Sequence, residues 1–148
     1  MCIRDSDGLA AIFSSDLRRA VETAELAFGG RGIPMVQDAR LRECNYGALN
    51  GMPVTRLTAE RPRRIVAPYP DGQSYQDVVA ATASFLRDLV VPWDGQRVLL
   101  IAHSANKWAL DVLLAGADLA ALVSAPFAWQ EGWHYTLPSG WSGPSSEQ

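Results

Sequence analysis

The chain has 148 residues, of which 48% are hydrophobic and 20% are charged, and its formal net charge is −3. This size and composition predict one globular domain, and the lack of like-charge blocks or of an apolar run of roughly 18 residues argues against a nucleic-acid or membrane partner. The only cysteines, Cys2 and Cys44, have neither metal-ligand nor disulfide-framework spacing, which favours free thiols in a reducing cytoplasm.

The two ends of the chain differ from its middle. The opening letters MCIRDSD show no periodicity, and the last ten residues are rich in Ser, Gly and Pro. We interpret residues 1–7 as a non-native scar, residues 8–138 as a single domain and residues 139–148 as a loose tail.

The first half of the domain alternates between strand and helix patterns. The apolar run Ala10–Ser15 predicts a buried strand. Helical spacing of apolar residues from Asp16 predicts a helix capped by Ser15 and Asp16 and ended at Gly29. A short strand, an ordered loop and a short helix are expected next, over Ile33–Asp38, Ala39–Pro53 and Val54–Glu60.

The second half continues this alternation. Ser74 is expected to cap a long helix whose apolar stripe runs from Tyr75 to Leu89. The letters RVLLIA have no polar alternation, which predicts a central strand buried on both faces. A helix from about Asn106 to Ala115 and two closing strands, Phe127–Gln130 and Trp133–Leu137, complete the order. The whole pattern predicts an α/β fold with a mostly parallel sheet.

Polar residues follow two of the predicted strands, where ligands bind in α/β folds. SSDLRRA begins a helix, and a phosphate bound there would offset the unfavourable position of Arg18 and Arg19 near the positive end of the helix dipole. Glu43, in a loop between two arginines, is a candidate general acid. Solvated arginines beside a helix cap and a surface ion pair at Glu43 remain the alternatives.

His103 and Ser104 follow the most apolar strand, and either residue is a candidate for the reacting group. The letters AHSAN resemble a nucleophile elbow, and the order Ser104, Asp118, His134 matches a hydrolase triad. Against this, Asn106 is bulky where such a turn needs a small residue. His103 is expected to be functional because of its place at the strand end, and His134 to be structural among its aromatic neighbours.

Three segments in this order, SSDLRRAVETA, RLRECNYGALNG and LLIAHSA, resemble the histidine phosphatase (phosphoglycerate mutase-like) superfamily. The resemblance covers about Ala10 to Leu114. PDGQSYQDV also resembles a family motif, although Gln73 stands where the family has glutamate. The first pattern is carried by Ser15, Asp16, Leu17, Arg19, Ala20, Thr23 and Ala24.

The resemblance implies a three-layer α/β sandwich and a role for each matching residue. Arg19 falls on the phosphate-binding arginine, Glu43 on the loop glutamate that acts as general acid, and His103 on the second catalytic histidine. Tyr46 is expected near the substrate, and Ser104 is expected to offer a backbone amide to it. The implied activity is hydrolysis of small phosphomonoesters through a phosphohistidine intermediate, with no metal and no cofactor. Serine esterase activity and non-catalytic phosphate binding remain the alternatives.

One family element has no match in the sequence. The family's nucleophilic histidine lies in an Arg-His-Gly motif after the first strand, and this chain has only His103 and His134. We therefore expect an N-terminal truncation without the first central strand, and an inactive chain. The segment Arg61–Gly72, with its three arginines, is expected either to contact a second anionic group of the substrate or to be a solvated loop.

Overall fold

A single parallel sheet organises the computed structural model, which describes residues 8–144. Its strands are β1 (Leu9–Ser14), β2 (Met35–Gln37) and β3 (Arg97–Ile101), in the order β2-β1-β3. The α-helices are α1 (Arg18–Phe28), α2 (Val54–Glu60), α3 (Tyr75–Leu89), α4 (Ser104–Ala115) and α5 (Leu119–Ser124). The proposed scar, residues 1–7, and the last four residues of the proposed tail lie outside the described residues.

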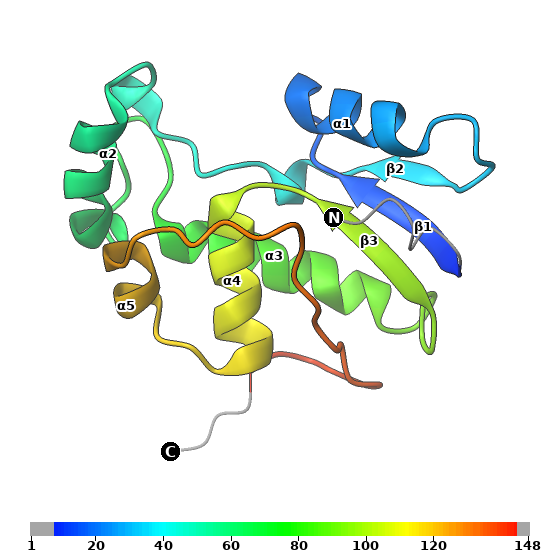
Figure 1. Ribbon diagram of the computed structural model, residues 1–148. Helices are drawn as coiled ribbons and strands as arrows, with labels where there is room; N and C mark the ends of the chain where they lie inside the picture. The colour runs from blue at the N-terminus through cyan, green and yellow to red at the C-terminus, as the bar shows by residue number, and fades with distance from the viewer. Residues whose placement is uncertain (1–7, 145–148) are drawn as a thin grey trace.

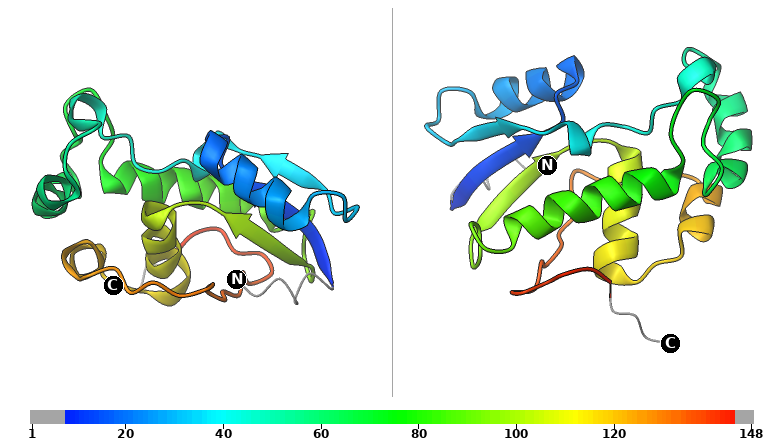
Figure 2. Two further views of the ribbon diagram at one scale, coloured as in Figure 1. Left: turned by 45° about the horizontal axis from the view of Figure 1, so that its top comes forward. Right: turned by 180° about the vertical axis from the view of Figure 1, so that it is seen from behind.

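The sheet separates two layers of helices (Figures 1 and 2). On one face, Ile12 of β1 packs with Ala24 and Phe28 of α1. On the other face, Ala11 and Phe13 join the larger core that α3 and α4 supply. Alternate residues of a strand point to opposite faces, so β1 contributes to both cores. The predicted α/β fold with a parallel sheet is confirmed.

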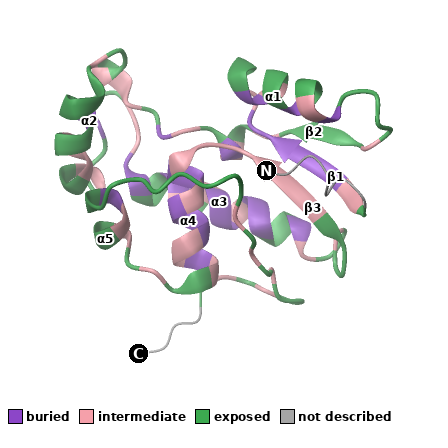
Figure 3. Ribbon diagram, viewed as in Figure 1, coloured by how far each residue is buried: buried purple, intermediate pink, exposed green. Residues whose placement is uncertain are grey.

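Strand β3 differs from the prediction. It lies at one edge of the three-stranded sheet, and its residues are only half-buried apart from the exposed Arg97, whereas Ala11–Ser14 of β1 are fully buried (Figure 3). The prediction that RVLLIA is a central strand buried on both faces is therefore wrong for the described residues. An apolar run reports the polarity of a strand but not the number of its neighbours.

The segment after α4 also differs from the prediction. The expected strands Phe127–Gln130 and Trp133–Leu137 are coil, and a short helix, α5, precedes them. Tyr135, Leu137 and Trp141 nevertheless pack against the larger core. This packing accounts for the apolar and aromatic residues of the segment. Within residues 8–144, no helix has both the length and the hydropathy that crossing a membrane requires.

The helix starts follow local rules at α3 but not at α1. Ser74 and Asp77 form a reciprocal capping box at the start of α3, as the sequence predicts for Ser74. Helix α1 has Leu17 at its N-cap and no side-chain cap, so the expected cap by Ser15 and Asp16 is wrong. Both side chains bond to residues far away in the sequence instead.

The loop between β2 and α2 is held by a close approach to a second loop. Gly47 has a φ of 53°, and a Cβ atom there would lie 2.1 Å from the carbonyl oxygen of Pro70. The backbone amide of Ala48 donates to the same oxygen at 2.8 Å. Only glycine fits this position without a shift of the backbone, and the contact orients the loop that carries Glu43.

Candidate active site

His103 lies beyond the carboxyl end of β3, between residues that β1 and α1 supply. Its Nε2 atom is 2.7 Å from Oγ of Ser15, which directly follows β1 and is completely buried. Its Nδ1 atom is 3.4 Å from a guanidinium nitrogen of Arg19, in the first turn of α1. Two segments separated by more than 80 residues thus meet at one imidazole because β1 and β3 are parallel neighbours.

The hydrogen bonds of His103 assign its protonation state. A guanidinium only donates, so Nδ1 must accept from Arg19, and Nε2 then carries the proton and donates to Ser15. This arrangement requires a neutral ring. In agreement, burial lowers the pKa of His103, Glu43 acts in the opposite direction, and Arg19 lowers the pKa further.

We therefore expect His103 to titrate below the ordinary histidine value of about 6.5, and its pKa to rise when orthophosphate binds, because a dianion stabilises the imidazolium. NMR titration of the ring protons with and without phosphate measures both values. His134, which lines a different cavity, supplies an internal reference signal. A His103 titration midpoint that does not change with phosphate would contradict this assignment.

Glu43 is held against the start of α4. Its Oε1 atom accepts hydrogen bonds from the backbone amides of Cys44 and Ala105, at 2.9 and 3.3 Å. Its Oε2 atom accepts from the hydroxyl of Ser104 at 2.9 Å. The Ser104 side chain thus orients Glu43, and the carboxylate lies at a helix N-terminus, where negative charge is stabilised.

Asn106 connects the two catalytic candidates and was missed by the sequence analysis. The residue is 2% exposed. Its amide oxygen accepts from the backbone N–H of His103 at 3.0 Å, and its nitrogen donates to the carbonyl of Arg42 at 3.2 Å. The available signal was an amide three residues after a possible N-cap, the position of a capping box. Asn106 thereby ties the end of β3 to the loop that carries Glu43.

A second connection joins this loop to the start of α1. Two guanidinium nitrogens of Arg42 donate to the two carboxylate oxygens of Asp16, each at 2.6 Å. The hydrogen bond from Arg42 lowers the pKa of Asp16. Sequence patterns do not reveal this pair, because 26 residues separate its members.

A cavity of about 630 Å³ adjoins the site, with Arg19, Glu43 and Tyr46 among its lining residues. Burial, followed by the charge of Glu43, raises the pKa of Tyr46 to about 12, so its hydroxyl is neutral and able to donate at pH 7. The Tyr46 ring packs edge-on against Tyr69 at a centroid distance of 5.2 Å. The structure therefore brings Arg19, Glu43 and Tyr46 to one cavity, with His103 and Ser104 in contact with its wall.

A comparison with protein families agrees with this arrangement. The model of the histidine phosphatase superfamily (branch 1) matches residues 4–130. The chain belongs to this superfamily.

Similar curated proteins and solved structures support the same assignment. "Probable phosphoglycerate mutase GpmB" of Yersinia pestis (strain Pestoides F) is 32% identical over 106 residues, which are 66% of this chain and 49% of the relative. The chain thus spans about half the length of the curated relatives it matches.

Among solved structures, YhfR of Bacillus stearothermophilus is 27% identical with a TM-score of 0.72, over 96% of this chain and 77% of that one. A mycobacterial glucosyl-3-phosphoglycerate phosphatase in complex with inorganic phosphate is 28% identical with a TM-score of 0.64, over 80% of this chain and 64% of that one.

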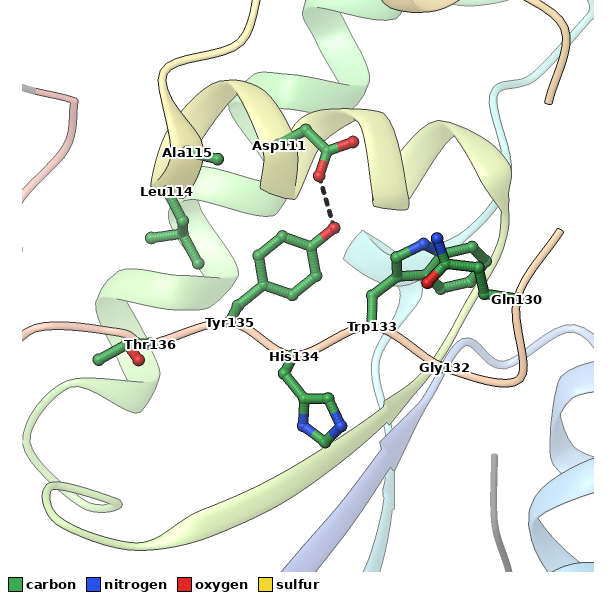
Figure 4. Close-up of a pocket in the computed structure, with 9 residues that line it drawn as sticks. All are labelled: Asp111, Leu114, Ala115, Gln130, Gly132, Trp133, His134, Tyr135 and Thr136. Carbon is green, nitrogen blue, oxygen red and sulfur yellow. Dashed lines mark hydrogen bonds between the residues drawn. The ribbon is translucent and has the colours of Figure 1, made fainter. Parts of the chain in front are cut away.

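The contacts of this histidine phosphatase chain do not assemble a serine hydrolase triad. The Ser104 hydroxyl donates to Glu43, and the carboxylate of Asp118 accepts from the backbone of α5. His134 lines a separate cavity of about 440 Å³ between α4 and residues 130–136 (Figure 4). There it points away from Tyr135, whose hydroxyl donates to Asp111 at 2.6 Å (Figure 4).

The loop arginines of this histidine phosphatase chain lie outside the cavity beside Arg19. The guanidinium of Arg61 lies over the ring of Trp108 at 5.3 Å. Arg64 pairs with Glu60 at 3.1 Å, and Arg63 is largely exposed. None of the three is among the residues that line the cavity.

Proposed function

We propose that this fold hydrolyses small phosphomonoesters through a phosphohistidine intermediate. The observation that carries the proposal is the meeting of Arg19 and His103 at the carboxyl ends of two parallel strands, with Glu43 on the wall of the adjoining cavity. A guanidinium and an imidazole together supply charge-assisted hydrogen bonds to phosphate oxygens, and electrostatic stabilisation of this kind dominates phosphoryl transfer.

Each residue has a role that follows from its contacts. Arg19 has no carboxylate partner among the described residues, so its guanidinium is available to a phosphate. His103, released from Arg19 and protonated, donates to a second phosphate oxygen. Glu43, held by Ser104 and the start of α4, protonates the departing ester oxygen as the P–O bond breaks, so that a neutral alcohol leaves. The carboxylate then takes a proton from the water that attacks phosphorus and releases the histidine.

The nucleophile of this reaction is a second histidine beside His103. The sequence contains only His103 and His134, and His134 lines the other cavity. We therefore propose that the 148-residue chain by itself binds phosphate at Arg19 and His103 but does not turn over phosphomonoesters. The phosphate complex of the mycobacterial relative is consistent with the binding part of this proposal.

Two measurements on the chain test the proposal. Calorimetry with orthophosphate should show binding, and an assay with para-nitrophenyl phosphate should show no turnover above background. Turnover that is lost in His103→Ala but kept in Ser104→Ala would contradict the need for a second histidine. Labelling of Ser104 by a fluorophosphonate probe would instead support a serine esterase. Absence of phosphate binding would overturn the proposed site.

A further inference from the structure

Among residues 8–144, the cavity beside Arg19 offers one cation without a carboxylate partner. We infer that it receives the neutral, hydroxyl-bearing part of a phosphomonoester and does not select substrates with a second anionic group. This inference rests on the proposed function, because it takes Arg19 as the phosphate ligand. It concerns the remainder of the substrate.

The cationic lining of the cavity is largely neutralised by ion pairs. Within the described ranges, the arginines that line it are Arg19, Arg40 and Arg42. Arg40 donates to Asp38 and Asp88, with closest distances of 2.8 and 2.6 Å, and this hydrogen bonding raises its pKa above the ordinary arginine value.

Arg42 is equally committed. Its two hydrogen bonds to Asp16 use both carboxylate oxygens, which is the strongest geometry for an arginine–carboxylate pair. Arg19 has only the 3.4 Å contact with His103 among the described residues. If Arg19 binds the phosphate, the described residues of the cavity wall include no further unpaired cation for a carboxylate or for a second phosphate.

The rest of the lining favours hydroxyl groups. Glu43 is the only carboxylate that the described part of the chain contributes to this lining, and it would repel a second anion. Tyr46 contributes a neutral hydroxyl, and Asn45, Asn50 and Gln73 contribute side-chain amides. The oxygens of Asn45 and Gln73 accept backbone hydrogen bonds, at 2.9 and 3.1 Å, which directs their NH₂ groups to other partners. Neutral donors of this kind suit the hydroxyls of a polyol or a sugar.

The test uses two ligands that share a three-carbon frame. Glycerol 3-phosphate has a neutral CH₂OH group where 3-phosphoglycerate has a carboxylate. Calorimetry at low ionic strength should give dissociation constants within about threefold of each other, or a preference for glycerol 3-phosphate. A preference of about tenfold or more for 3-phosphoglycerate would overturn the inference. If neither ligand nor orthophosphate binds, the proposed function fails together with the inference, whereas phosphate binding with a carboxylate preference overturns the inference alone.

A variant that frees Arg42 from its carboxylate partner tests whether ion pairing of the lining arginines causes the lack of preference for a second anion. Asp16→Asn removes the carboxylate partner, so binding of 3-phosphoglycerate should strengthen about fivefold relative to glycerol 3-phosphate. Glu22→Gln is the matched control, because it makes the same change in net charge beside Arg18, which pairs with Glu22 on the exposed side of α1 and does not line the cavity. An equal effect of the two variants, or no selective gain in Asp16→Asn, would overturn the inference.

Discussion

Replacing Arg19 with glutamine is expected to weaken orthophosphate binding about 100-fold, because the variant loses one or two charge-assisted hydrogen bonds that each contribute roughly 1.5–3 kcal/mol. Glutamine keeps a donor of similar reach but removes the positive charge. Arg19 is the only arginine on the cavity wall without a carboxylate partner in the described part of the chain, so no neighbour replaces it. Isothermal calorimetry in a low-salt buffer measures the change.

Arg18→Gln is the matched control for this prediction. Arg18 is adjacent in the sequence, and the change in net charge is the same. Its side chain is 91% exposed and pairs with Glu22 one helical turn away. We expect a change of less than about twofold, since Arg18 is already paired with Glu22 and is not among the residues that line the cavity. Equal losses of phosphate affinity in the two variants would show that binding depends only on the net charge of the chain. Arg19 would then not belong to the proposed site.

Replacing Asn106 with leucine is expected to lower the free energy of unfolding by about 2–4 kcal/mol. The two side chains branch in the same way at Cγ, but leucine leaves the N–H of His103 and the carbonyl of Arg42 without their partner. A buried polar group without a hydrogen bond destabilises a protein by roughly 1–3 kcal/mol. Urea denaturation followed by tryptophan fluorescence measures the difference.

Asn50→Leu provides the comparison for Asn106. Asn50 is an exposed asparagine that lines the same cavity as Glu43, and no hydrogen bond of its side chain occurs within residues 8–144. We expect its effect to stay within about 0.5 kcal/mol. Similar losses of stability in the two variants would mean that the hydrogen bonds of Asn106 to His103 and Arg42 do not stabilise the fold.

Local rules in the sequence account for much of the fold. The stripe from Tyr75 to Leu89 and its Ser74 cap depend on residues three or four positions apart, so one sequence is enough to locate α3. The parallel sheet followed from the alternation of strand and helix patterns. Those patterns also put Arg19 and His103 beyond strand ends, but the strand patterns alone did not show that β1 and β3 are neighbours.

Errors in the sequence analysis arose where long-range contacts override local preference. Ser15 and Asp16 have the residue types of a helix cap, yet Ser15 accepts from His103 and Asp16 from Arg42. The guanidinium of Arg42 is a stronger partner for Asp16 than the backbone amides of a first helical turn. The half-buried ring of His103 gives the buried hydroxyl of Ser15 a partner. β3 was expected at the centre of the sheet because its composition carries no information about its neighbours.

The sequence by itself determined the α/β class, the membership in the histidine phosphatase superfamily and the residue types available for phosphate chemistry, because these depend on periodicity and on motifs within short segments. Only the tertiary structure decided which of these residues touch. Three features depend on contacts across 26 to 88 residues: the neutral ring of His103, the hydrogen bond of Ser104 to Glu43, and the ion pair between Arg42 and Asp16. Such contacts exist only after parallel strands bring their carboxyl ends to one edge of the sheet, and they leave Arg19 as the cation available to a phosphate.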